Sequence, residues 1–139
     1  MNKARVLFLC VGNSCRSQIA EAIVNARLGD RWEAFSAGSR PEGYVHPLAI
    51  KALSEIGINH QGRSKSIEEF RNVPFNLVVI CCDQDDDQCP VWLGKEKVVH
   101  HPFPDPYKVT GSEAEKMAAY QSVRDRILEE IPLELVKLH

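Results

Sequence analysis

The chain has 139 residues and a mass of 15.6 kDa, which fits one domain of common size, and we expect residues 1–139 to form it. Hydrophobic residues make up 44% and charged residues 26%, an ordinary globular composition that excludes a disordered or collagen-like chain. The net charge of −2 and the pI of about 6.2 argue against nucleic-acid binding and against an electrostatic membrane anchor.

The first expected element is a buried strand at residues 6–9, which are continuously apolar. The apolar run ends at residue 11, so it is shorter than the core of an export signal and far shorter than a membrane span. We therefore expect a cytoplasmic protein that works as a monomer, without membrane contact. Further strands are predicted at residues 32–36, 76–80 and 97–100.

Helical patterns separate these strands. One helix is expected over residues 17–28, and another over residues 47–57, where a proline opens it and a glycine closes it. Capping boxes at residues 66–69 and 112–115 predict a short helix and a long one. Pro132 is expected to end the long helix. The inward face of that helix is predicted to carry Tyr120, Val123, Ile127 and Ile131.

Strands separated by helices imply parallel pairing with right-handed crossovers. The predicted fold is therefore an α/β single-domain sandwich, with a roughly four-stranded parallel sheet flanked by helices. Ligands bind such sheets at the carboxyl ends of the strands. Three segments with candidate chemistry follow predicted strand ends, at residues 10–17, 81–89 and 101–107.

The first of these segments reads Cys-Val-Gly-Asn-Ser-Cys-Arg-Ser and has the character of an anion cradle. Gly12 and Asn13 favour backbone turns in which successive N–H groups point inward, and the following helix N-terminus adds positive potential. Arg16 offers a planar fork for two oxygens of a tetrahedral anion. The residues expected to bind the anion are Val11, Gly12, Asn13, Ser14, Cys15, Arg16 and Ser17.

Cys10 is the expected nucleophile of this segment, because the positive field favours its thiolate. Ser17 is placed to donate a hydrogen bond to that thiolate or to ease its departure. The arrangement suits attack on phosphate or arsenate, whereas the glycine-rich lysine pattern of nucleotide-binding loops is missing. The alternative is a structural Cys10 at a strand end. Cys15 is expected to pack beneath the loop as a small hydrophobe.

Residues 10–17 resemble the phosphate-binding loop of the low-molecular-weight protein tyrosine phosphatases. Asp105-Pro106 resembles the general-acid loop of that family, which implies that Asp105 is the acid. The resemblance covers nearly the whole chain, including residues 36–38 and 123–125, and it implies the phosphatase fold. Two enzyme groups share this scaffold, the phosphatases themselves and the arsenate reductases coupled to thioredoxin.

The five cysteines bear on the choice between these groups, since an odd count in a small chain is a poor disulfide framework and indicates reduced thiols. Cys10, Cys82 and Cys89 match, residue by residue, the three redox cysteines of the thioredoxin-coupled arsenate reductases. The match implies a transient Cys10–Cys82 disulfide followed by a Cys82–Cys89 disulfide. Cys81 is expected to be structural and to point to the opposite face. The alternative is a buried Cys82 and a surface Cys89 without redox roles.

A helix over residues 82–89 would be incompatible with a Cys82–Cys89 bond. The two Cα atoms would lie about 10 Å apart at about 1.5 Å per residue, whereas a disulfide needs them within about 7 Å. A helical segment must therefore unwind when the bond forms. Aspartates and glutamines fill most of the interval and propagate a helix weakly, so the unwinding is expected to cost little.

The resemblance implies arsenate reduction in which Cys10 attacks, Asp105 protonates the leaving oxygen, and Cys82 and Cys89 relay the disulfide. It also implies an external thiol reductant, thioredoxin, in place of a bound cofactor; glutathione with glutaredoxin is the other candidate reductant. A tyrosine phosphatase that uses Cys10, Arg16 and Asp105 is the second possibility. A non-catalytic phosphocysteine carrier is the third, and it has no need of Arg16 or Asp105.

Some reductases of this group hold a monovalent cation beside the loop, and Asn13, Glu21 and Ser36 match that site. Lys65 stands where those members carry an aspartate, so we expect no metal. The Lys65 ammonium either occupies the niche near Glu21 or is a solvated surface group. Tyr107 is expected to pack, the alternative being that it stacks on an aromatic substrate. The histidines show no metal-ligand spacing with the cysteines.

Overall fold

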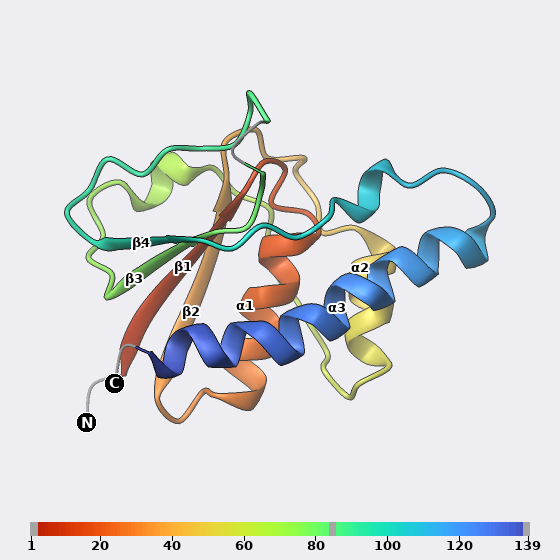
Figure 1. Cartoon of the computed structure of the whole chain (residues 1–139), viewed down its shortest axis with the longest axis horizontal. Coiled ribbons are helices and arrows are strands. Elements are labelled where there is room, and N and C mark those ends of the chain that lie inside the picture. The colour runs from red at the N-terminus through yellow and green to blue at the C-terminus, as the bar shows by residue number, and fades with distance from the viewer. Residues whose placement is uncertain (1–2, 84–85, 138–139) are drawn as a thin grey trace.

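A computed structural model describes residues 3–83 and 86–137 (Figure 1). The strands are β1 (Ala4–Cys10), β2 (Trp32–Gly38), β3 (Leu77–Ile80) and β4 (Lys97–His100). The α-helices are α1 (Arg16–Arg27), α2 (Pro47–Ser54) and α3 (Glu113–Val136), and two 3-10 turns are η1 (Ile67–Phe70) and η2 (Pro106–Lys108). None of the helices in the described ranges is long and apolar enough to cross a bilayer.

The strands form one sheet in the order β2-β1-β3-β4, and all three pairings are parallel. The predicted four-stranded parallel sheet is thereby confirmed. Helices α1, α2 and α3 lie together on one side of the sheet, while η1 lies on the other (Figure 1). Because every strand runs the same way, the carboxyl ends of all four strands share one edge of the sheet.

Strand β1 is buried on both faces, which explains its unbroken apolar sequence. Its residues Val6 and Phe8 belong to the apolar cluster formed with α1, α2 and α3. Leu7 and Leu9 belong to a second cluster, with η1 and Trp92. These four side chains of β1 are fully buried. Burial of this kind stabilises the fold by about 1.5–3 kcal/mol per side chain.

Helix α3 begins as the sequence predicts but does not end there. Ser112 and Glu115 make both hydrogen bonds of a capping box, which confirms the expected start. The prediction that Pro132 ends the helix is wrong, because the helix continues to Val136 with the proline inside it. Leu135, one turn beyond the proline, is only 1% exposed and joins the main core, so its burial offsets the lost backbone bond.

The capping box expected at residues 66–69 is also wrong in part. The Ser66 side chain accepts a hydrogen bond from the Glu68 N–H and so caps the turn. The Glu69 carboxylate does not return to the backbone; it makes two bonds of 2.7 and 2.9 Å to the Arg63 guanidinium. The element is a short 3-10 turn, in which Ser66 caps the first turn and Glu69 forms an ion pair with Arg63.

Candidate active site

The loop between β1 and α1 is fixed by the side chain of its left-handed residue. That residue is Asn13, with φ of 48°, a conformation that asparagine tolerates better than most residues. Its amide N–H donates to Ser17 Oγ over 2.8 Å, and its amide oxygen accepts from the Lys65 N–H and from Gln18 Nε2. Because Asn13 is fully buried, these bonds are shielded from water and hold the loop in one conformation.

Cys10 lies at the base of this loop with its sulfur 2.8 Å from Ser17 Oγ. The Ser17 oxygen also accepts the Asn13 amide proton, and its own hydroxyl proton is available to the sulfur when Cys10 is a thiolate. A donated hydrogen bond stabilises a thiolate, the form of cysteine that acts as a nucleophile. The predicted pairing of Cys10 with Ser17 is therefore present in the structure.

Arg16 and Asp105 meet above the loop from distant parts of the chain. One guanidinium nitrogen lies 3.4 Å from an Asp105 oxygen, and a second donates to the Phe103 carbonyl over 3.5 Å. The Arg16 side chain is 6% exposed and that of Asp105 is 21% exposed, so the acid retains access to solvent. Asp105 also accepts a hydrogen bond from the Tyr107 N–H, which fixes the carboxylate at the start of η2.

A cavity of about 60 Å³ opens over Cys10 between these groups. Ser14 lines it, and the Ser14 hydroxyl is the buried side-chain oxygen without a hydrogen-bond partner in the described parts of the chain. An unpaired buried hydroxyl is costly unless a ligand satisfies it. The side chains and backbone around the cavity come from Cys10, Val11, Gly12, Ser14, Cys15, Arg16, Glu42, Asp105 and Tyr107.

The loop's second thiol, Cys15, is a packing group, as predicted. It is 5% exposed and its sulfur donates a hydrogen bond to Tyr120 Oη over 3.4 Å. Burial raises the pKa of the Cys15 thiol to about 12, so it stays protonated near neutral pH. Cys81 is fully buried in the cluster on the helical face, and burial raises its pKa as well.

Cys82 and Cys89 are joined by a disulfide, with their Cα atoms 5.8 Å apart. Cys82 is fully buried in the cluster on the other face of the sheet from Cys81, as predicted, and Cys89 is partly exposed. Residues 82, 86 and 89 are bends, residues 87–88 form a turn and residue 83 has no regular structure, while residues 84–85 lie outside the described part of the chain. The bonded segment thus has the close Cα spacing that a helix over the same interval excludes.

The whole chain matches one known family. The model of the low molecular weight phosphotyrosine protein phosphatase family covers residues 5–137. The chain belongs to this family. The resemblance carried by residues 10–17 and by Asp105-Pro106 is therefore confirmed at the level of the family.

Both enzyme groups on this scaffold appear among the relatives of the chain. An arsenate reductase of Halalkalibacterium halodurans is 43% identical over 128 residues, 91% of either chain. The solved low-molecular-weight protein tyrosine phosphatase of T. tengcongensis aligns with a TM-score of 0.74 at 26% identity, over 97% of this chain and 99% of that one. A solved thioredoxin-dependent arsenate reductase of Corynebacterium glutamicum gives a TM-score of 0.69 at 26% identity, over 97% of this chain and 63% of that one.

Lys65 is buried beside the loop at residues 11–15, with its ammonium near Glu21. Of the two alternatives for this residue, the position near Glu21 is the one observed, and the solvated surface position is not. Lys65 is 9% exposed, and its ammonium lies 3.7 Å from a Glu21 oxygen and 2.8 Å from the Arg63 carbonyl. Ser36 donates to the same Glu21 oxygen over 2.9 Å. Burial lowers the pKa of Lys65 and raises that of Glu21, and the attraction between the two groups opposes both shifts.

Glu42 is the residue at the cavity that sequence reasoning missed. It lies in the segment after β2, which forms a fourth carboxyl end of the parallel sheet. That segment runs beside the loop, with the Arg40 N–H on the Val11 carbonyl and the Glu42 N–H on the Gly12 carbonyl. The position of Glu42 was predictable from the sequence, because the segments that follow parallel strands all lie at the same edge of the sheet.

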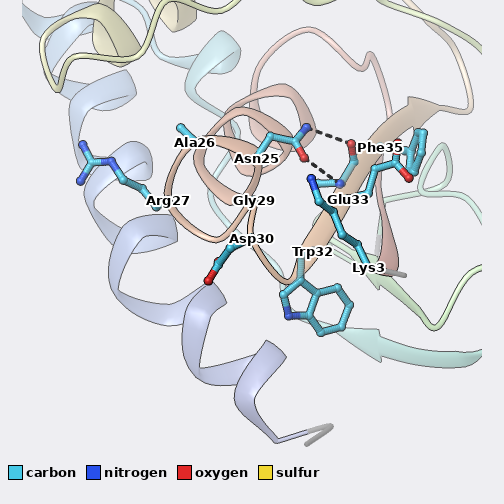
Figure 2. A pocket seen from close by; sticks show the side chains of 10 residues that line it. Lys3, Asn25, Ala26, Arg27, Gly29, Asp30, Trp32, Glu33 and Phe35 are labelled. Atoms are coloured by element: carbon cyan, nitrogen blue, oxygen red, sulfur yellow. Dashed lines mark hydrogen bonds between the residues drawn. The ribbon is translucent and has the colours of Figure 1, made fainter. Parts of the chain in front are cut away.

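A larger hollow lies at the amino end of β2, away from Cys10, and Figure 2 shows the side chains around it. Its volume is about 720 Å³. Asn25 at its wall bonds both the N–H and the carbonyl of Ala34, so this polar group already serves to join α1 to β2 (Figure 2). The remaining lining is Lys3, Ala26, Arg27, Gly29, Asp30, Trp32, Glu33 and Phe35. This exposed groove shares none of the groups gathered around Cys10.

Proposed function

We propose that the protein reduces arsenate to arsenite with Cys10 as the nucleophile and Cys82 and Cys89 as the relay. The Cys82–Cys89 disulfide carries this conclusion, because phosphate-ester hydrolysis needs no redox pair beside its nucleophile. The 43% identical relative named arsenate reductase supports the same substrate.

In the first step the Cys10 thiolate attacks arsenic, and a sulfur–arsenic bond forms as an arsenic–oxygen bond breaks. The loop N–H groups and Arg16 hold the anionic oxygens. Asp105 gives a proton to the departing oxygen, which leaves as water. The distance of 3.4 Å between an Asp105 oxygen and the guanidinium of Arg16, the proposed anion-binding group, supports this role.

In the second step the Cys82 thiolate attacks the Cys10 sulfur. The sulfur–arsenic electron pair stays on arsenic, which leaves as arsenite, and a Cys10–Cys82 disulfide forms. Two thiols thus supply the two electrons that convert arsenic(V) to arsenic(III). Cys89 then attacks Cys82, frees Cys10, and leaves the Cys82–Cys89 disulfide.

Thioredoxin is the reductant we propose for this disulfide. The name of the Corynebacterium glutamicum relative supports a thioredoxin-dependent reaction. Cys82 is fully buried and Cys89 is partly exposed, so an external thiolate reaches the Cys89 sulfur first. Reduction by thioredoxin implies a reducing compartment, for which we propose the cytoplasm, and we propose separately that the protein acts as a monomer. We also infer that no bound metal or organic cofactor takes part.

The test is to treat fully reduced protein with arsenate under anaerobic conditions and to map its thiols by mass spectrometry. The expected result is one Cys82–Cys89 bridge and one arsenite per chain, because one relay cycle consumes two thiols. Inorganic phosphate is the matched control, since it binds as the same tetrahedral anion and accepts no electrons here. Protein that keeps all five thiols after arsenate treatment would contradict the proposal.

Hydrolysis of phosphate monoesters is a second activity for the same site. Cys10, Arg16 and Asp105 supply the nucleophile, anion fork and acid that it needs. Tyr107 favours it, because this aromatic side chain lines the cavity and is 54% exposed, where an aromatic leaving group is able to stack. Release of phenol from phenyl phosphate by the reduced protein tests this activity directly.

A further inference from the structure

Glu42 is an exposed residue that lines the Cys10 cavity, and its backbone is hydrogen-bonded to the loop at residues 11–15. Its N–H donates to the Gly12 carbonyl over 2.9 Å. Its Cγ lies 2.9 Å, and its Oε1 3.5 Å, from the point that a Cβ atom on residue 12 would occupy. Gly12 is not among the residues with positive φ, so the glycine serves to leave room for this side chain.

The cavity that Glu42 borders is small. Its volume is about 60 Å³, which suits one small tetrahedral oxyanion but not an aromatic ring attached to it. Asp105 and Tyr107 line the cavity from a different segment. An organic group attached to the anion must therefore leave the cavity past Glu42, past these two residues, or into the adjoining hollow of about 730 Å³ that Arg16 and Asp105 also line.

Free oxyanions and esters differ at the oxygen that points away from the loop. The loop N–H groups and Arg16 bind the other oxygens, whatever the fourth one carries. In hydrogen phosphate or hydrogen arsenate that oxygen carries a proton, which an ionised carboxylate accepts. In a monoester it carries carbon, which offers no proton to the Glu42 carboxylate.

We propose that Glu42 is a specificity-determining residue that favours free tetrahedral oxyanions over organic phosphate monoesters. The selectivity rests on a hydrogen bond that only the free anion donates to the Glu42 carboxylate. The proposal rests on the proposed function for the identity of the natural oxyanion, arsenate, but its selectivity is measurable with phosphate alone.

The experiment compares the binding of inorganic phosphate and phenyl phosphate by calorimetry near pH 7.5, where both ligands carry a similar charge. Reduced protein with Cys10→Ser prevents turnover, and Glu42→Ala is introduced into this background. The ratio of the two dissociation constants is expected to shift at least about tenfold toward the ester, because a hydrogen bond to a charged group is lost. Glu42→Gln, which keeps the bulk and one acceptor oxygen, is expected to shift the ratio less.

Glu129→Ala is the matched control, because Glu129 is exposed on α3 and its loss changes the net charge equally. It is expected to leave the ratio of dissociation constants unchanged. Equal weakening or equal strengthening of both ligands in Glu42→Ala would overturn the proposal, as would an unchanged ratio. A parent protein that fails to reduce arsenate would contradict the proposed function alone, because the phosphate comparison involves no reduction.

Discussion

The loop at residues 11–15 and the disulfide-bearing segment at residues 82–89 follow neighbouring strands of one sheet but are held very differently. In the first, Asn13, Ser14 and Cys15 are buried, and the Asn13 side chain ties three other residues to the loop. In the second, Asp83, Asp87 and Gln88 are exposed. Its side-chain ties include the Ser39 hydroxyl on the Gln88 carbonyl and an Asp86–Lys108 pair at 3.9 Å.

The difference matches what each segment has to do in the proposed reaction. A site that stabilises an oxyanion works best when its donors are fixed before the anion arrives. A cysteine that attacks one sulfur and is then attacked by another must change its position between steps. The residues next to Cys10 are thus buried and hydrogen-bonded, whereas those next to Cys89 are exposed to solvent.

Cys82→Ser is expected to have the largest effect, because it should abolish the activity that needs the segment at residues 82–89 and keep the activity that needs only the loop at residues 11–15. We expect arsenate turnover with thioredoxin to fall below detection, because no thiolate remains to attack the Cys10 sulfur. Phenyl phosphate hydrolysis, which uses only the loop at residues 11–15, Cys10, Arg16 and Asp105, should remain within about twofold, because it needs no second thiol. The two assays are run on the same reduced preparation. Parallel loss of both activities would count against a relay.

Cys89→Ser should stop the relay one step later. A single turnover is expected, yielding one arsenite per chain and a trapped Cys10–Cys82 disulfide, because the next nucleophile is missing. Peptide mapping after a stoichiometric arsenate addition checks both quantities. Cys81→Ala serves as the control, since Cys81 is fully buried on the other face and should leave repeated turnover in place. Sustained turnover in Cys89→Ser would exclude its role as the resolving thiol.

Asn13→Ala tests the rigid side of the comparison. Alanine has no amide to hold Ser17, Gln18 and the Lys65 backbone, and it adopts the left-handed conformation at a cost of about 1–2 kcal/mol. We expect kcat/KM to fall about 10- to 100-fold for both arsenate and phenyl phosphate, because misplacement of a preorganised site affects every substrate that uses it. Asn13→Gly, which accepts the backbone conformation but lacks the same bonds, isolates the side-chain contribution. A loss confined to arsenate would show that the loop is not shared.

Much of the structure of β1 and of the loop at residues 11–15 can be predicted from the sequence. The apolar run of β1, the left-handed tolerance of Asn13 and the spacing from Cys10 to Arg16 all arise within one short segment. Local patterns of this kind predict local structure, and the parallel topology then places Asp105 at the same edge of the sheet.

What the sequence leaves open depends on contacts between distant residues. The helix passes through Pro132 because Leu135 is buried in the core, and no local pattern reports that burial. Glu42 reaches the cavity because Gly12 has no side chain, a relation between two loops that neither loop reveals alone. The niche of Lys65 likewise needs Glu21 and the Arg63 carbonyl to be brought together by the fold.

Lys65→Met is expected to have the smallest effect on chemistry and a measurable one on stability. It leaves the buried Glu21 carboxylate without its cation, which costs about 3 kcal/mol or more for a buried pair. Burial already raises the pKa of Glu21 above its unfolded value, and Lys65 opposes that rise. Without Lys65 the native pKa rises further, so native protein binds more protons than unfolded protein and loses stability as pH increases through that range.

Urea unfolding at pH 5 and pH 7.5 measures this effect, and the deficit of Lys65→Met should be larger at pH 7.5. Lys51→Met, at an exposed position of α2, is the control and should stay within about 0.5 kcal/mol of the parent at both values. A deficit of equal size at the two pH values would mean that Lys65 stabilises the loop by packing and backbone bonds alone. The ammonium would then not act as the counter-charge of Glu21.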